Sequence, residues 1–141
     1  MEQGQIPEQL LADCHHLGRL PATEVLLNRN AALPWFILVP ETRLSDVLDL
    51  PDEHRQAVIA DCAAVSEFIK HVLGFDKVNF ADLGNVVPAM HLHIIGRHPQ
   101  DPCWPQPIWG NLPGGATYTV EQLREWQDGL ARMTGLVTAP L

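Results

Sequence analysis

Two histidines at alternate positions are the residues of this chain best suited to chemistry. His91 and His93 lie in the stretch 89–97, which reads AMHLHIIGR. Successive side chains of a strand point to opposite faces, so this alternation with large apolar residues predicts a strand. One face would carry both histidines together with Arg97, and the other would pack into a core. The predicted core-facing residues are Met90, Leu92 and Ile94.

Three roles are open for this histidine pair. Both rings can be core side chains whose nitrogens bond to the backbone. They can bind a metal with His98 as a third ligand, although zinc requires three or four ligands and no Asp, Glu or Cys lies within six residues before His91. They can also act at phosphorus, where one imidazole attacks and its neighbours orient it and stabilise the oxyanion. Spacing alone does not decide between these roles.

Groups that could surround a phosphate lie close to the histidines in the sequence. Asn79 and Asn85 carry amide donors, Arg97 carries a guanidinium, and backbone N–H groups near Gly84 are free to point at an anion. Catalysis at phosphorus is therefore a hypothesis with candidate partners already present.

Composition restricts the class of protein. The chain has 141 residues, 46% of them hydrophobic, which suits a single globular domain over 1–141. Its net charge is −8 with only nine Lys and Arg, so nucleic acid is not an expected partner, whereas a small phosphorylated ligand is. Apolar runs are too short to cross a membrane and no secretory signal begins the chain, so a cytoplasmic protein is expected. Three dispersed cysteines indicate neither a disulfide framework nor a cysteine metal site, and we expect no cofactor.

The order of the predicted elements indicates an α+β fold, an antiparallel sheet with one long helix and a C-terminal helix packed on it. Apolar periodicity predicts the long helix over about 52–73, and Thr119 with Gln122 has capping-box spacing that begins a helix over about 119–134. Gly135 is placed to end it. A helical turn is expected at 8–13, and strands are expected at 14–20, 23–28, 35–39 and 77–80, followed by the histidine strand.

The histidine stretch resembles the motif of the histidine triad superfamily, His-φ-His-φ-His-φ-φ, which is often followed by Pro or Gly and Arg. The resemblance extends over about 14–110, including the turn and strand at 28–40. The segments LGNVVP at 83–88, Trp104-Pro105 and Trp109-Gly110 are similar to a bacterial branch described as diadenosine-polyphosphate-hydrolase-like. The first triad position departs from the motif, because it is Ala89.

The resemblance implies a function and a set of site residues. His91 would be the nucleophile that attacks an α-phosphorus, and His93 would support the phosphate and the leaving group. Asn79 and Asn85 would contact phosphate, and Asn28 or Asn30 would hold the ribose. In the family, the histidine that Ala89 replaces organises the network behind the nucleophile.

The implied protein is a nucleotide-binding hydrolase or transferase, and by resemblance a homodimer. Its substrates would be dinucleoside polyphosphates, nucleoside phosphoramidates or adenylylated small molecules. Two alternatives stay open, a nucleotide-binding module with little turnover and a metal-binding protein that uses the His91/His93 pair.

Overall fold

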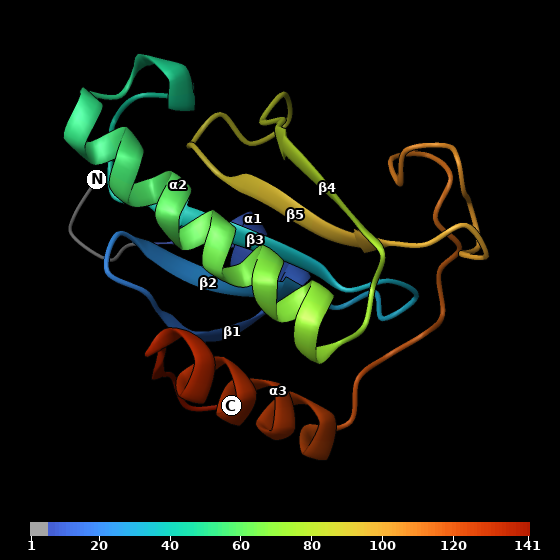
Figure 1. Cartoon of the computed structure of the whole chain (residues 1–141). Helices are drawn as coiled ribbons and strands as arrows, with labels where there is room; N and C mark the ends of the chain where they lie inside the picture. The colour runs from blue at the N-terminus through green and yellow to red at the C-terminus, as the bar shows by residue number, and fades with distance from the viewer. Residues whose placement is uncertain (1–5) are drawn as a thin grey trace.

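A six-stranded antiparallel sheet organises the computed structural model, which describes residues 6–141 (Figure 1). The strand order is β4-β5-β3-β2-β1-β6, so β4 and β6 lie at the two edges. The strands are β1 (Cys14–Arg19), β2 (Thr23–Asn28), β3 (Trp35–Pro40), β4 (Lys77–Asp82), β5 (Leu92–Arg97) and β6 (Val137–Thr138). Strand β5 therefore lies between β3 and β4, so the residues of the histidine strand have neighbours on both sides.

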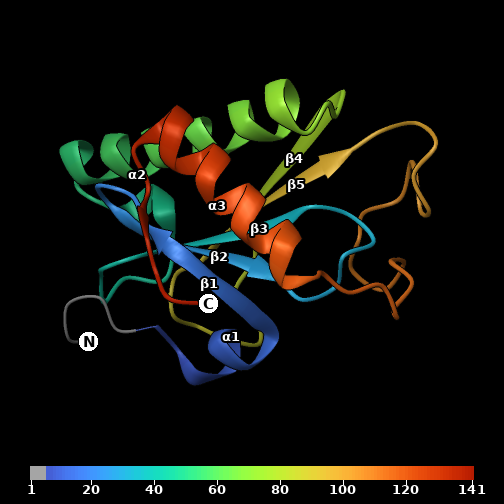
Figure 2. The same ribbon diagram turned by 90° about the horizontal axis from the view of Figure 1, so that it is seen from below.

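The helices divide between the two faces of the sheet. Helices α2 (Asp52–Glu67) and α3 (Val120–Thr134) cover one face, while α1 (Glu8–Asp13) lies on the other (Figure 2). A 3-10 turn, η1 (Val47–Asp49), precedes α2, and a π-helical turn, η2 (Phe68–Val72), continues it. The α+β architecture expected from the sequence is confirmed. Within residues 6–141, none of the helices has the length and apolar character needed to cross a membrane.

The main core lies between the sheet and helices α2 and α3. Phe36 of β3, Phe68 of η2 and Trp126 of α3 meet there with ring centroids 6.0–6.4 Å apart. The predicted inward-facing residues of the histidine strand join the same core. They are Met90, Leu92 and Ile94. The alternation in the sequence thus gives the correct orientation, with the histidines on the face opposite to α2 and α3.

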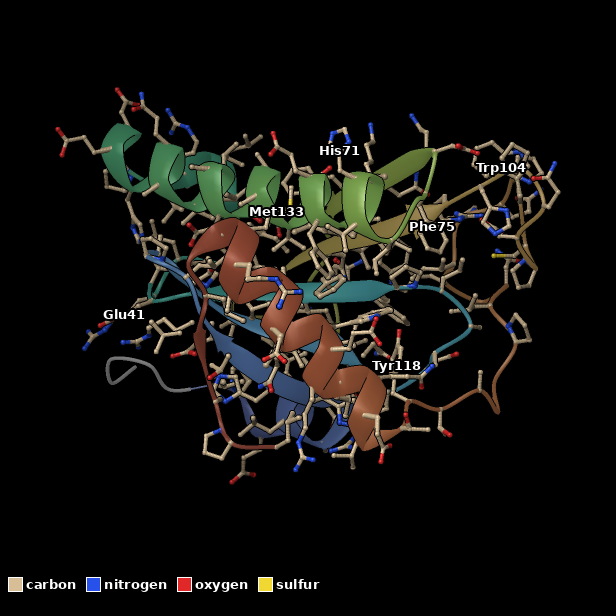
Figure 3. All side chains as sticks on the ribbon, turned by 60° about the horizontal axis from the view of Figure 1, so that its bottom comes forward. Glu41, His71, Phe75, Trp104, Tyr118 and Met133 are labelled. Carbon is tan, nitrogen blue, oxygen red and sulfur yellow. The ribbon has the colours of Figure 1, made fainter. Side chains whose placement is uncertain are left out.

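The segment between β5 and α3 covers part of the histidine face. Its buried side chains Cys103 and Ile108 pack against Leu33 and Ile95, and Trp109 packs beside them. Figure 3 shows Trp104 in this segment at the end of the sheet where Phe75 also lies. The proline-rich stretch is therefore part of the fold and forms one wall beside the histidines.

The C-terminal helix has the ends that the sequence predicts. The Thr119 hydroxyl accepts a hydrogen bond from the Gln122 backbone N–H, and the Gln122 side chain accepts one from the Thr119 N–H. Gly135 has a φ of 76° and ends the helix in the left-handed region.

Three elements differ from the expectation. The histidine strand begins at Leu92, because β3 pairs with it only as far as Leu38 and β4 only as far as Asp82, so His91 lies just before the strand. The last turn of the predicted long helix is π-helical. Strand β6 was not predicted; its two residues are exposed and pair with β1 through the backbone, which leaves no hydrophobic pattern.

Candidate active site

His91 is held by the backbone two residues before it. Its Nδ1 lies 2.7 Å from the carbonyl oxygen of Ala89. A carbonyl only accepts hydrogen bonds, so Nδ1 must carry the proton, and the neutral ring then has its lone pair on Nε2. Among residues 6–141, Nε2 has no hydrogen-bond partner. The ring therefore has the tautomer that a nucleophile requires.

His93 is held in the opposite tautomer by a side chain from β3. The indole Nε1–H of Trp35 donates to its Nδ1 at 3.0 Å. Because an indole nitrogen only donates, Nδ1 must be unprotonated, and Nε2–H then donates to the carbonyl of Leu83 at 3.2 Å. Burial of the ring, together with the neighbouring His91, lowers the pKa of His93 to about 4. His93 is thus a neutral hydrogen-bond donor near pH 7.

The two rings lie edge to face, with their centroids 5.0 Å apart. A ring with a free lone pair therefore stands next to a ring with an N–H donor. The Trp109 ring meets the His93 ring edge to face, with centroids 5.0 Å apart, and meets the Trp35 ring edge to face at 6.1 Å. The two indoles form an aromatic wall beside the two histidines. Both histidines are nearly covered, with 5% of His91 and 4% of His93 exposed. Such an arrangement can attack an electrophile and donate a hydrogen bond to the charge that develops.

The loop between β4 and β5 lies against the nucleophile candidate. A Cβ atom added at Gly84 would lie 3.3 Å from Cε1 of His91 and 2.8 Å from the carbonyl oxygen of Val87. Glycine is therefore the residue that allows the backbone to approach the ring this closely. Val86 in the same loop is largely exposed, while Val87 packs against the smaller core on the α1 side.

Arg97, one of the groups that the sequence offered as a possible phosphate donor, is bonded within the protein in this structure. The guanidinium is 1% exposed and all of its nitrogens have partners in the protein. It donates to Asp101, to the Asn79 side chain and to the Gln106 carbonyl at 2.7–3.2 Å. The Trp104 ring also lies 5.6 Å from its Cζ. Arg97 instead holds the covering segment onto the sheet.

The structure places the two predicted phosphate-contacting asparagines differently. Asn79 lies on β4 opposite Ile95, on the histidine face, and its Oδ1 accepts from Arg97 at 2.9 Å. Its amide nitrogen has no hydrogen-bond acceptor among residues 6–141, so it can donate to a ligand. Asn85 is exposed in the loop beside Gly84. Both stay predictions as phosphate contacts.

The two candidate ribose ligands are distinguished by their hydrogen bonds. Asn30 uses both ends of its amide within the fold, accepting from the Ala32 N–H at 3.0 Å and donating to the Pro113 carbonyl at 3.0 Å. Asn28 accepts from the Asn30 N–H at 2.9 Å, and its NH₂ group has no partner in the part of the chain described. Asn28 therefore retains a donor for a ligand, whereas Asn30 ties its turn to the segment before α3.

The structure does not assemble the three-histidine metal site considered from the sequence. Between residues 6 and 141 there is no group of three or more His, Cys, Asp or Glu side chains that could hold a metal ion. The Nδ1 of His98 accepts from the Gln100 N–H at 3.2 Å, and its ring lies 5.6 Å from that of Phe75.

Trp35 is the functional candidate that sequence reasoning missed. It begins the continuous apolar strand expected at 35–39, and no role at the site was expected for it from the sequence. The signal was its indole N–H, because a half-buried tryptophan normally finds an acceptor for that group.

Comparison with known proteins identifies the family of this chain. A family model described as the HIT domain matches residues 9–100. A histidine triad protein from Marinobacter aquaeolei is 39% identical, with a TM-score of 0.84 over 93% of this chain and 96% of its own. One from Bradyrhizobium japonicum is 30% identical, with a TM-score of 0.85 over 92% and 97%. One from Sinorhizobium meliloti is 28% identical, with a TM-score of 0.84 over 92% and 96%. A search of curated proteins gave no match.

The fold and the paired histidines thus define a histidine triad class of protein, and the chain belongs to the HIT domain family. Members of this family are in general nucleotide-binding hydrolases or transferases.

Proposed function

We propose that the protein cleaves a bond at the α-phosphorus of a nucleotide through a nucleotidyl intermediate on His91. The Nε2 lone pair attacks phosphorus, an N–P bond forms, and the bond from phosphorus to the leaving group breaks. Water then attacks the same phosphorus, the N–P bond breaks, and a nucleoside monophosphate leaves. The substrate classes are dinucleoside polyphosphates, nucleoside phosphoramidates and adenylylated small molecules.

One observation carries this proposal, the hydrogen bond of 2.7 Å from His91 Nδ1 to the Ala89 carbonyl. It supports a nucleophile with its lone pair at Nε2. His93 is proposed to support the phosphate and leaving group, with Asn79 and Asn85 as further phosphate contacts. Asn28 is favoured over Asn30 for the ribose, because its NH₂ group has no partner within 6–141.

The test is to trap the adduct. Wild-type protein is mixed with a dinucleoside polyphosphate and with a nucleoside phosphoramidate, then denatured in alkali and digested for mass spectrometry. A nucleotidyl group on the peptide that contains His91 is expected in wild type and in His98→Ala, but not in His91→Ala. If no adduct forms and wild type releases no more nucleoside monophosphate than His91→Ala, the enzyme proposal is wrong.

The burial of both histidines favours a second candidate function, a nucleotide-binding module with little turnover. Only 5% of His91 and 4% of His93 is exposed, so the two rings offer a substrate little accessible surface. This candidate predicts saturable nucleotide binding by calorimetry and slow release of product. A turnover above about 1 s⁻¹, which is ordinary for an enzyme, would reject it.

We also propose that the protein is a homodimer in which edge strand β4 pairs with its copy. The outer edge of β4 has no neighbouring strand within 6–141, and Phe80 on it is 50% exposed. Antiparallel self-pairing about the centre of the strand sets Lys77 opposite Asp82, which is favourable for charge.

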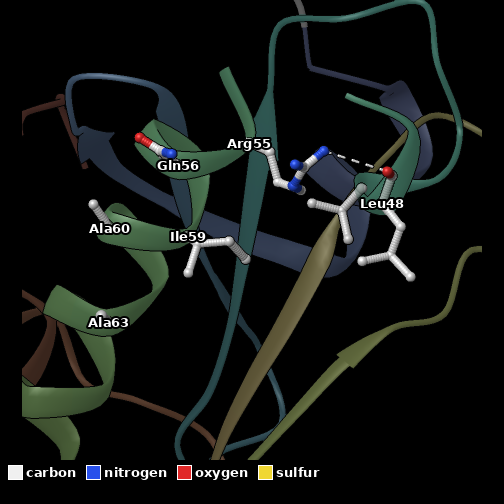
Figure 4. A pocket seen from close by; sticks show the side chains of 7 residues that line it. Leu48, Arg55, Gln56, Ile59, Ala60 and Ala63 are labelled. Carbon is white, nitrogen blue, oxygen red and sulfur yellow. Dashed lines mark hydrogen bonds between the residues drawn. The ribbon is translucent and has the colours of Figure 1, made fainter. Parts of the chain in front are cut away.

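An apolar groove of about 410 Å³ runs between η1 and α2 (Figure 4). It is lined by Val47, Leu48, Arg55, Gln56, Ile59, Ala60 and Ala63.

Light scattering coupled to size exclusion tests the dimer. Phe80→Glu is expected to give a monomer, because it places a carboxylate at the paired edge. Val137→Glu is the matched control, since Val137 is 71% exposed on β6 at the opposite edge. A wild-type monomer at about 100 µM, where a homodimer with a Kd of about 1 µM would be mostly assembled, would contradict the proposal.

A further inference from the structure

The hydrogen bonds on His93 link three separate parts of the chain. Trp35 on β3 donates to Nδ1 of His93 at 3.0 Å. The Nε2–H of His93 donates at 3.2 Å to the carbonyl of Leu83, which begins the loop between β4 and β5 that lies against His91. The ring thus connects the sheet to the loop. Since the indole accepts no hydrogen bond, the Trp35 contact is compatible only with a proton on Nε2.

We propose that Trp35 is a positioning residue: its indole N–H holds His93 as an Nε2–H donor, and that donor passes from the Leu83 carbonyl to a phosphoryl oxygen of a bound nucleotide. This inference rests on the proposed function. It assigns to β3 the control of the tautomer of His93, while the backbone at Ala89 controls that of His91.

Two contacts support the exchange of partners. The acceptor of the Nε2–H, 3.2 Å away, is a backbone carbonyl on a loop with exposed residues. The Trp35 side of the ring is fixed by the sheet, because Trp35 pairs with Ile95 and Ile37 pairs with His93 across β3 and β5. Release of the loop therefore leaves the Nε2–H pointing where the Leu83 oxygen was. An anionic oxygen is a stronger acceptor than a peptide carbonyl.

Trp109 provides a matched control. It meets the His93 ring at 5.0 Å, closer than the 6.0 Å of Trp35, but no hydrogen bond joins it to that ring within the described chain. Trp35→Phe removes the donor and keeps an aromatic ring, and Trp109→Phe removes an indole that only packs. A difference between these variants therefore reports on the hydrogen bond and not on the loss of aromatic surface.

The first measurement requires no substrate. Long-range ¹H–¹⁵N spectra of histidine side chains at pH 7, assigned with His93→Gln, are expected to show His93 with a protonated Nε2 in wild type and in Trp109→Phe. In Trp35→Phe the Leu83 carbonyl still favours Nε2–H, but with one of the two constraints removed the Nδ1–H form should become populated beside it. Wild-type protein in the Nδ1–H form, or an unchanged tautomer in Trp35→Phe, would overturn the inference. If Trp35→Phe does not fold, the wild-type tautomer and protection of the Trp35 indole proton from solvent exchange decide.

The second measurement adds adenosine monophosphate. The His93 Nε2–H signal should move on binding while the tautomer stays the same, and a signal that saturating nucleotide leaves unmoved would reject the exchange of partners. In turnover, Trp35→Phe should lower kcat at least about tenfold with little change in KM, as expected for loss of an oriented donor. If no substrate is cleaved by wild type, the proposed function fails, while the tautomer result still stands on its own.

Discussion

The carbonyl oxygen of Ala89 accepts the Nδ1–H of His91 at 2.7 Å, so a backbone group orients the nucleophile candidate. The side chain at position 89 takes no part in this bond. The sequence motif suggested that a histidine at this position organises the network behind His91. In this chain the tautomer of His91 is set without it.

Substitutions at Ala89 that preserve the backbone should therefore preserve chemistry at His91. Ala89→Ser is expected to keep the nucleotidyl adduct and to change kcat/KM by less than about tenfold, which corresponds to about 1.4 kcal/mol. Ala89→Pro should lose activity, because proline restricts the backbone that carries the carbonyl. Steady-state kinetics with adduct mass spectrometry measures both. A loss in Ala89→Ser as large as that in His91→Ala would show that the side chain is needed.

Gly84→Ala should reduce activity with little effect on global stability. The new methyl group would lie 2.8 Å from the Val87 oxygen and 3.3 Å from His91, so the loop or the ring must shift. A misplaced nucleophile costs about a hundredfold in rate, and we expect a loss of that order in kcat. Gly114→Ala is the control, since a Cβ there meets no atom within 4 Å. Equal activity in the two variants would mean that the approach of the loop to His91 does not matter.

The faces of the histidine strand could be predicted from sequence because side chains alternate on a strand. That alternation alone separates Met90 and Leu92 from His93 and Arg97. The ends of α3 were equally readable, since a capping box is local.

The partners of these side chains could not be predicted. Trp35 and His93 are 58 residues apart, and their contact depends on the register between β3 and β5. The charge of Arg97 made it a possible phosphate donor in the sequence. Its pairing with Asp101 could not be predicted, because Asp101 lies in a proline-rich segment without periodic structure. Alternation gives the face on which a group lies and leaves its partner undetermined.

The buried ion pair between Arg97 and Asp101 should contribute strongly to stability. Its two contacts measure 2.7 and 3.2 Å, and both side chains are almost fully buried. Asp101→Asn is expected to lower the free energy of unfolding at pH 7 by about 3–5 kcal/mol, because it leaves the buried guanidinium without a counter-charge. The exposed pair of Arg55 and Asp52, 2.6 Å apart, is the control, and Asp52→Asn should cost less than about 1 kcal/mol.

The same ion pair sets an acid limit. Burial raises the pKa of Asp101, but hydrogen bonds from Arg97 and from the backbone of His98 and Cys103 outweigh it and lower the pKa to about 2 from 3.8. The lowered value stabilises the folded state above pH 3.8, and this contribution is lost as the pH falls through about 2. Urea unfolding of wild type and Asp101→Asn at pH 7 and pH 2.5 measures it. The difference between the two proteins should shrink at pH 2.5, and an unchanged difference would contradict this assignment.

His93 should make the free energy of unfolding depend on pH in a separate window. Burial lowers its pKa to about 4 in the folded state, against 6.5 ordinarily, so between these values the unfolded chain binds a proton that the folded chain does not. Stability must therefore rise with pH from 4 to 6.5, by up to about 1.4 kcal/mol per pH unit.

Burial also lowers the pKa of His15, which remains in every variant, so the contribution of His93 is measured as the difference between wild type and a His93 variant. Urea unfolding of His93→Gln and wild type at pH 4.5, 5.5 and 6.5 should give a flatter profile for the variant. Measurements at pH 7 and 8 are the internal control, because His93 is mostly neutral there in the unfolded state and neutral in the folded state. Parallel profiles from pH 4.5 to 6.5 would show that His93 is protonated in the folded protein, which the Trp35 indole N–H facing its Nδ1 opposes.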